Sequence, residues 1–91
     1  MVGRGAGADG QVNHLSGTAS SGNGNWSFVG HDGGIGVYNL ADTATAGAGV
    51  SGYATGSGNL NARGRLNVGM GAGSSGVFNV NTSGTLAIGY Q

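Results

Sequence analysis

The stretch that decides the fold covers residues 66–89 and reads LNVGMGAGSSGVFNVNTSGTLAIG. Large apolar residues occupy every second position in three short runs of this stretch, at Leu66 and Val68, Phe78 and Val80, and Leu86 and Ile88. Such alternation places one set of side chains on one face of a β-strand. The Gly residues between the runs would each cost a helix about 1 kcal/mol. The stretch therefore predicts short strands joined by Gly-rich turns.

A four-residue pattern of Gly, any residue, a large apolar residue and Asn occurs four times in the chain. Its copies are Gly10-Gln11-Val12-Asn13, Gly36-Val37-Tyr38-Asn39, Gly58-Asn59-Leu60-Asn61 and Gly76-Val77-Phe78-Asn79. The segment 2–10 also aligns with 68–76 without a gap. Repeats of a strand-and-turn unit are typical of stacked architectures. We interpret residues 1–91 as a single repeat array, cut from a longer one, with units at approximately 2–29, 30–51, 52–68 and 69–91.

These features predict an all-β chain folded as a parallel β-solenoid (β-helix) of about four coils, which would lie about 4.8 Å apart. Stacking would set equivalent residues above one another and gather the large apolar side chains in a thin core. One expected core column contains Val12, Tyr38, Leu60 and Phe78; the other contains Phe28 or Trp26, then Val50, Val68 and Ile88. A β-sandwich or small barrel is the rival fold, but it predicts no register between units.

The Asn of the repeated pattern has two interpretations. Stacked amides can hydrogen-bond along the axis, as they do in cross-β assemblies. The candidates for such an Asn ladder are Asn13, Asn39, Asn61 and Asn79. Alternation along the strand equally allows these side chains to face solvent, and the sequence leaves both interpretations open.

The composition excludes several classes of partner. Among 91 residues there are 23 Gly, no Pro and no Cys, and charged residues make up 7% with zero net charge. The chain has no basic patch for nucleic acid and no apolar run near the ~20 residues of a membrane helix. Without Cys, disulfides and thiolate metal sites are excluded. Disorder is not favoured, because disordered chains usually combine low hydrophobicity with high net charge.

Catalytic, cofactor and metal sites are not predicted. His31 adjoins Asp32 in a Gly-rich segment, but a Ser-His-Asp triad requires a geometry that adjacency does not supply, so turn polarity is the preferred interpretation. The Gly-rich run 3–8 lacks the following helix of a phosphate site. Calcium needs 6–8 oxygen ligands, and the last two units contain no carboxylate. Trp26 is interpreted as a core residue in preference to an exposed platform for sugars.

The run from Gly58 to Gly89, with its Leu66-Asn67-Val68-Gly69, Gly76-Val77-Phe78-Asn79-Val80 and Leu86-Ala87-Ile88-Gly89 elements, resembles the autotransporter-associated β-strand repeats. These repeats occur in long Gly-, Asn-, Ser- and Thr-rich surface proteins of Gram-negative and related bacteria. The resemblance implies a right-handed parallel β-helix that projects from the cell. It also implies an extracellular or cell-surface location. The motif is degenerate and indicates a class of repeat.

Two hypotheses for function follow. The first is a structural or adhesive spacer, without enzymatic activity, whose partners are neighbouring repeats and other copies of itself. An open stack exposes strand edges, so end-to-end stacking into oligomers or filaments is expected. The second is a solenoid that presents a flat polar face, formed by the Asn column, to a surface glycan or to ice.

Overall fold

The computed structural model describes residues 1–40, 58–80 and 82–89. This part of the chain forms β-strands and contains no helix, which confirms the predicted all-β class. The strands are β1 (Val2–Arg4), β2 (Asp9–His14), β3 (Thr18–Ser20), β4 (Trp26–His31), β5 (Ile35–Leu40), β6 (Asn59–Ala62), β7 (Arg65–Met70), β8 (Ser75–Val80) and β9 (Leu86–Ile88).

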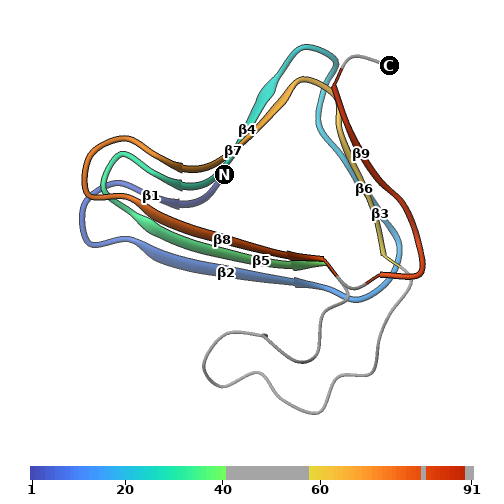
Figure 1. The fold of residues 1–91 in the computed structure, drawn as a ribbon, viewed down its shortest axis with the longest axis horizontal. Coiled ribbons are helices and arrows are strands. Elements are labelled where there is room, and N and C mark those ends of the chain that lie inside the picture. The colour runs from blue at the N-terminus through green and yellow to red at the C-terminus, as the bar shows by residue number, and fades with distance from the viewer. Residues whose placement is uncertain (41–57, 81, 90–91) are drawn as a thin grey trace.

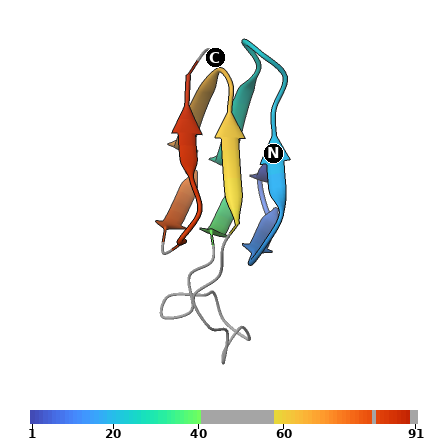
Figure 2. The ribbon, with the colours of Figure 1, turned by 90° about the vertical axis from the view of Figure 1, so that its right-hand side faces the viewer.

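The strands form three parallel sheets of three strands each, in the orders β1-β4-β7, β2-β5-β8 and β3-β6-β9. We call them the first, second and third sheet. They lie along the sides of a triangle (Figure 1). Seen from the side, the strands of one sheet stand next to one another along the short axis (Figure 2). The principal extents are 34 × 33 × 13 Å, and the shortest suits three strands spaced about 4.8 Å apart.

The pairing register shows after how many residues the chain returns to the same sheet. Val2 pairs with Val29, and Val29 pairs with Val68. One passage through the three sheets therefore leads from Val2 to Val29, and the next leads from Val29 to Val68. The expected unit boundary at 51–52 lies outside the described residues. The division into units and the count of about four coils stay predictions.

Three members of the first expected core column lie in one column, and each of them is half-buried. Val12, Tyr38 and Phe78 are aligned across the second sheet. Leu60 instead belongs to the third sheet, where it pairs with Ala19 and Leu86. The repeated pattern marks a strand that begins near a Gly, but each passage contains several strands. A local match therefore does not specify the sheet.

The second expected column also needs correction. Val29, and not Phe28, pairs with Val68, while Phe28 pairs with Asn67. Ile88 lies in the third sheet opposite Ala62. Neighbouring residues of a strand face opposite sides, so this one-residue difference buries Val29 and leaves Phe28 partly exposed. Val50 lies outside the described residues.

Two columns of Gly allow the first and second sheets to approach each other closely. The first-sheet column contains Gly3, Gly30 and Gly69, and the second-sheet column contains Gly10, Gly36 and Gly76. A Cβ on each second-sheet Gly would lie against the backbone nitrogen of its first-sheet counterpart. The Gly that opens the repeated pattern in the second sheet is thus required by backbone packing.

Gly30 is, with Gly3, one of the two most restrictive of these positions. The φ of Gly30 is +74°, and a Cβ there would overlap with the carbonyl oxygen of Ser75. Both the backbone conformation and the neighbouring strand therefore exclude a side chain. Gly7 has a similar φ of +81°, but a Cβ added there would meet no heavy atom within 4 Å. Ala substitutions at Gly30 and Gly7 can therefore distinguish the free-energy cost of positive φ from the cost of steric overlap.

The interior is thin and is best covered on the middle strands. Val29, Leu40 and Ala62 form the buried hydrophobic core, one residue from each sheet. A cavity of about 190 Å³ lies between the sheets, lined in part by Tyr38 and Phe78. The core side chains therefore pack mainly against the equivalent residues of neighbouring strands in the same sheet. They pack less against side chains of the other two sheets.

We predict that Gly30→Ala destabilises the fold by at least about 2 kcal/mol, because positive φ and steric overlap both oppose the new methyl group. Gly7→Ala, the matched control, should cost about 1 kcal/mol from conformation alone. Urea unfolding of both variants provides the measurement. Equal costs would contradict the close approach of the two sheets at Gly30.

Candidate functional site

An Asn ladder runs across the second sheet. The Asn39 side-chain Nδ2 donates to Oδ1 of Asn13 at 2.9 Å, and Nδ2 of Asn79 donates to Oδ1 of Asn39 at 2.7 Å. Gln11 adds a donor to the same Asn13 oxygen at 3.1 Å. The Asn39 side chain is buried, so its bonds replace contacts with water. The ladder interpretation is thus correct for these three Asn residues.

Asn61 does not belong to this ladder. It lies on β6 of the third sheet, where its Nδ2 donates to Oγ of Ser20 at 3.4 Å. The reason is the same as for Leu60: the two residues belong to one copy of the repeated pattern, and that copy forms a strand of a different sheet.

An aromatic column lies beside the ladder in the second sheet. The rings of Tyr38 and Phe78 are stacked with centroids 5.1 Å apart, and His14 meets Tyr38 edge-on at 6.1 Å. The Tyr38 hydroxyl lies 2.8 Å from Nδ1 of His14, whose Nε2 lies 3.1 Å from the carbonyl oxygen of Gly17. Because that carbonyl only accepts, a neutral His14 donates a hydrogen bond from Nε2. Its Nδ1 then accepts a hydrogen bond from the Tyr38 hydroxyl. Burial raises the pKa of Tyr38 above 10.0.

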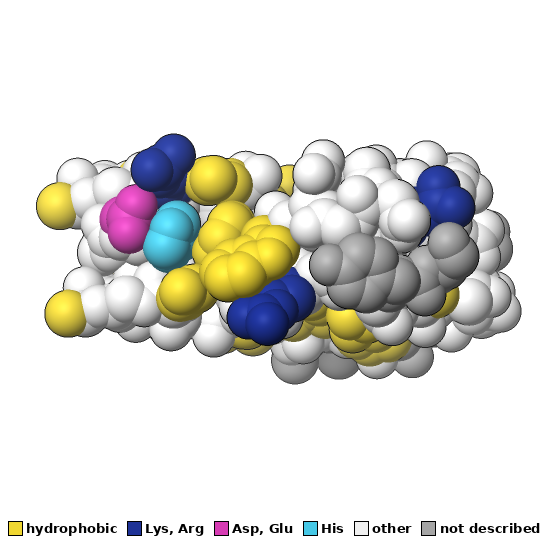
Figure 3. Space-filling model, turned by 90° about the horizontal axis from the view of Figure 1, so that it is seen from above, with side chains coloured by type: hydrophobic (Ala, Val, Ile, Leu, Met, Phe, Trp, Pro, Cys, Tyr) yellow, Lys and Arg dark blue, Asp and Glu magenta, His cyan; other side chains and the backbone are white. Residues whose placement is uncertain are grey.

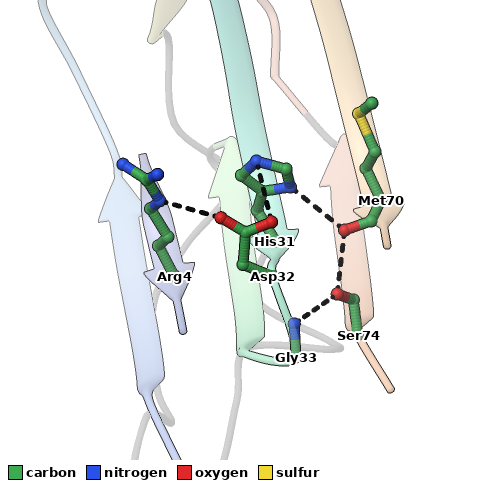
Figure 4. A network of polar contacts seen from close by, with 6 residues as sticks. All are labelled: Arg4, His31, Asp32, Gly33, Met70 and Ser74. Atoms are coloured by element: carbon green, nitrogen blue, oxygen red, sulfur yellow. Dashed lines mark hydrogen bonds and ion pairs between the residues drawn. The ribbon is translucent and has the colours of Figure 1, made fainter. Parts of the chain in front are cut away.

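A polar network joins the corners between the first and second sheets (Figure 4). Nε of Arg4 lies 3.1 Å from Oδ2 of Asp32, and Nε2 of His31 lies 3.4 Å from Oδ1 of the same carboxylate. His31 Nδ1 lies 3.1 Å from the carbonyl oxygen of Met70. The Ser74 hydroxyl donates to this oxygen at 2.8 Å and accepts from the backbone N–H of Gly33 at 2.9 Å. The network thereby fastens three successive corners together.

The corner network lacks the contacts of a nucleophilic triad. The hydroxyl of Ser74 bonds to backbone groups, and both ring nitrogens of His31 have other neighbours. A general base must lie within hydrogen-bond reach of the nucleophile. The arrangement is instead suited to holding the corners in register. Asp32, with a φ of +52°, takes the left-handed conformation that Gly adopts in the neighbouring corners.

Trp26 is exposed, contrary to its interpretation as a core residue. The guanidinium carbon of Arg65 lies 4.6 Å from its ring centroid, and Phe28 and His31 stack 4.2 Å apart on the same strand. Figure 3 views this side of the molecule, where hydrophobic side chains lie beside basic, acidic and His side chains. Trp26 is exposed because alternate residues of a strand face the same side. It therefore shares the outer face of β4 with Phe28, opposite the buried Val29.

Several contacts had no clear signal in the sequence. The bond between His14 and Tyr38 and the ion pair between Arg4 and Asp32 each join residues of different strands or corners. The gapless match of 2–10 with 68–76 would place Arg4 and Met70 in one column. It does not reveal the contact with Asp32, because His31 lies between Arg4 and Met70 in that column and Asp32 is the residue that follows it.

Within the described residues, no group of three or more His, Cys, Asp or Glu side chains could hold a metal ion. The same part of the chain has no helix of the length and hydropathy needed to cross a membrane. Comparisons of the chain with protein-family models, with curated proteins and with solved structures found no match.

We predict that Asn39→Ala destabilises the chain by about 1–3 kcal/mol, because it removes a buried group that bonds to both neighbouring strands. Asn61→Ala is the matched control; it loses a longer, exposed bond and should cost less than about 0.5 kcal/mol. Chemical denaturation gives both values. Similar costs for the two variants would contradict the special role of the ladder.

We also predict a loss of stability at alkaline pH. The folded chain holds the Tyr38 proton more tightly than the unfolded chain, so this contribution is complete below pH 10.0 and declines as pH rises through and beyond it. Tyr38→Phe should cost about 1 kcal/mol at neutral pH, from the lost bond to His14. It should also flatten the alkaline decline. Unfolding free energies measured over a pH series test both; identical slopes would refute the assignment.

Proposed function

We propose that this chain is a non-catalytic structural or adhesive segment of an extracellular bacterial β-solenoid. The observation that carries the proposal is the in-register stacking of like residues. Val12, Tyr38 and Phe78 form one column, and Asn13, Asn39 and Asn79 form the next. Three sheets that each gain a strand per passage form an architecture that extends by repetition. The resemblance to autotransporter-associated repeats supports the location at the bacterial surface.

The proposed mechanism is mechanical. Parallel backbone pairing joins each passage to the next on three sides, and the Asn ladder adds side-chain bonds along the same direction. The corner network ties Arg4, Asp32 and Ser74 across successive turns. Tension along the stack would be shared by these bonds. A surface with zero net charge limits charge-dependent contacts with other molecules.

A glycan-presenting role has one observation in its favour, on a different surface from the expected one. The buried Asn39 makes the Asn column a poor flat face for glycan or ice. The exposed Trp26, held by Arg65 and near the Phe28–His31 stack, offers a ring on which a sugar could pack. Binding on a glycan array that is lost in Trp26→Ala and kept in Asn61→Ala would favour this role.

For the structural role, we predict a β-sheet circular dichroism spectrum and a cooperative thermal transition. Trypsin offers a second measurement, because the chain has no Lys and three Arg residues. Cleavage after Arg63 and Arg65 should be slow in the native state and fast after heating, since backbone pairing on both sides of this turn protects it. Arg4 lies in β1, where it pairs with His31, and cleavage after it should be slow in the native state as well. A random-coil spectrum with rapid cleavage at every Arg would overturn the proposal.

A further inference from the structure

The apolar columns are uncovered at one edge of the stack. This edge consists of β7, β8 and β9, each the last strand of its sheet. In the first sheet, Val29 is 2% exposed while its partner Val68 is 44% exposed. In the second sheet the values are 0% for Leu40 and 50% for Val80. A further strand added beside β7 or β8 would cover these side chains, as β7 covers Val29 and β8 covers Leu40.

The third sheet repeats the contrast. Ala62 is 1% exposed, whereas its partner Ile88 is 54% exposed. Each sheet therefore contributes one uncovered apolar residue to the same edge, which also presents the outer backbone groups of its three strands. Strand edges of this kind pair readily with another chain. We call the surface formed by β7, β8 and β9 the C-terminal edge, and that formed by β1, β2 and β3 the N-terminal edge.

The N-terminal edge fits the C-terminal edge in register. β2, β5 and β8 have the same length and pair residue for residue, so β2 of a second copy could follow β8 as β8 follows β5. At the corners, the junction would place two four-residue corners next to each other, whereas within the molecule each four-residue corner lies next to a three-residue one. Four residues separate β1 from β2, and four separate β7 from β8, whereas three separate β4 from β5. In both four-residue corners the first and third residues are Gly with positive φ.

The direction of the Asn ladder specifies how a second copy would be oriented. Both bonds between Asn side chains run the same way, with the amide of each donor Asn pointing toward β2. A copy added in the same sense continues this direction and keeps the strands parallel. A copy turned over would pair the strands antiparallel and reverse the amides at the junction. Zero net charge leaves no general repulsion between copies.

We propose that the C-terminal edge of one copy binds the N-terminal edge of a second copy of this chain, head to tail. Val68 would lie opposite Val2 of the second copy, and Phe78 and Asn79 opposite its Val12 and Asn13. For residues 1–91 on their own, the contact leaves a free edge at each end, so it extends into a filament. The triangular end of the stack covers about half of a rectangle of 34 by 33 Å, roughly 560 Å², which is somewhat below the about 800 Å² per partner that standard interfaces bury. This inference rests on the solenoid role proposed above.

The experiment uses the absence of Cys from the chain. The double variant Val2→Cys/Val68→Cys places one thiol at each edge of the same column. Within one chain the thiols are separated by the Val29 strand, about 10 Å in total, which is too far for a disulfide. Between stacked copies they would be about 4.8 Å apart, measured between Cα atoms, which a disulfide can span. Under oxidised glutathione, a non-reducing gel should show a ladder of dimers, trimers and larger species.

The control is Val2→Cys/Ile88→Cys, whose thiols lie in different sheets and should give no ladder. Sedimentation of the unmodified chain should show a mass that rises with concentration. A β-sheet spectrum with a monomer at every concentration would overturn the stacking and leave the solenoid role intact. A random-coil spectrum would overturn both. Equal ladders from the two double variants would refute the register, and dimers from Val68→Cys alone would indicate a turned-over partner.

Discussion

The close approach of two backbones is the constraint on which this structure depends. The first and second sheets meet where Gly30 lies against Gly36, and the same contact recurs at Gly3 with Gly10 and at Gly69 with Gly76. At five of these six positions, all except Gly69, a methyl group would overlap with backbone atoms and separate the sheets. Gly is therefore a packing requirement of the stack at these five positions.

The sequence predicts the strands better than it predicts their partners. Alternation at Phe78 and Val80 depends only on neighbours along the chain, so the all-β class could be inferred. The sheet that contains Leu60 depends on how many strands the chain completes before it returns. That number is not encoded in the pattern around Leu60 itself. The same uncertainty displaces Asn61 from the ladder. The exchange of Phe28 for Val29 has another cause, a difference of one residue in the phase of β4.

Candidate sites are less predictable, because they join residues whose distance depends on corner length. Arg4 and Asp32 meet because β1 pairs with β4, which places Arg4 opposite His31 and next to Asp32. Exposure of Trp26 follows from a one-residue phase that composition cannot reveal. The Asn ladder was easier to infer, because identical residues at matching positions place the same amides next to each other.

The distribution of burial has a consequence for how stability depends on length. Fully covered apolar residues occur on middle strands, at Val29, Leu40 and Ala62. A three-strand sheet has one middle strand and two outer ones, so much of its hydrophobic surface borders solvent. Each additional passage would convert an outer strand into a middle one. Stability per residue should then rise with the number of passages, as it does in one-dimensional repeat proteins, and approach a constant value in long arrays.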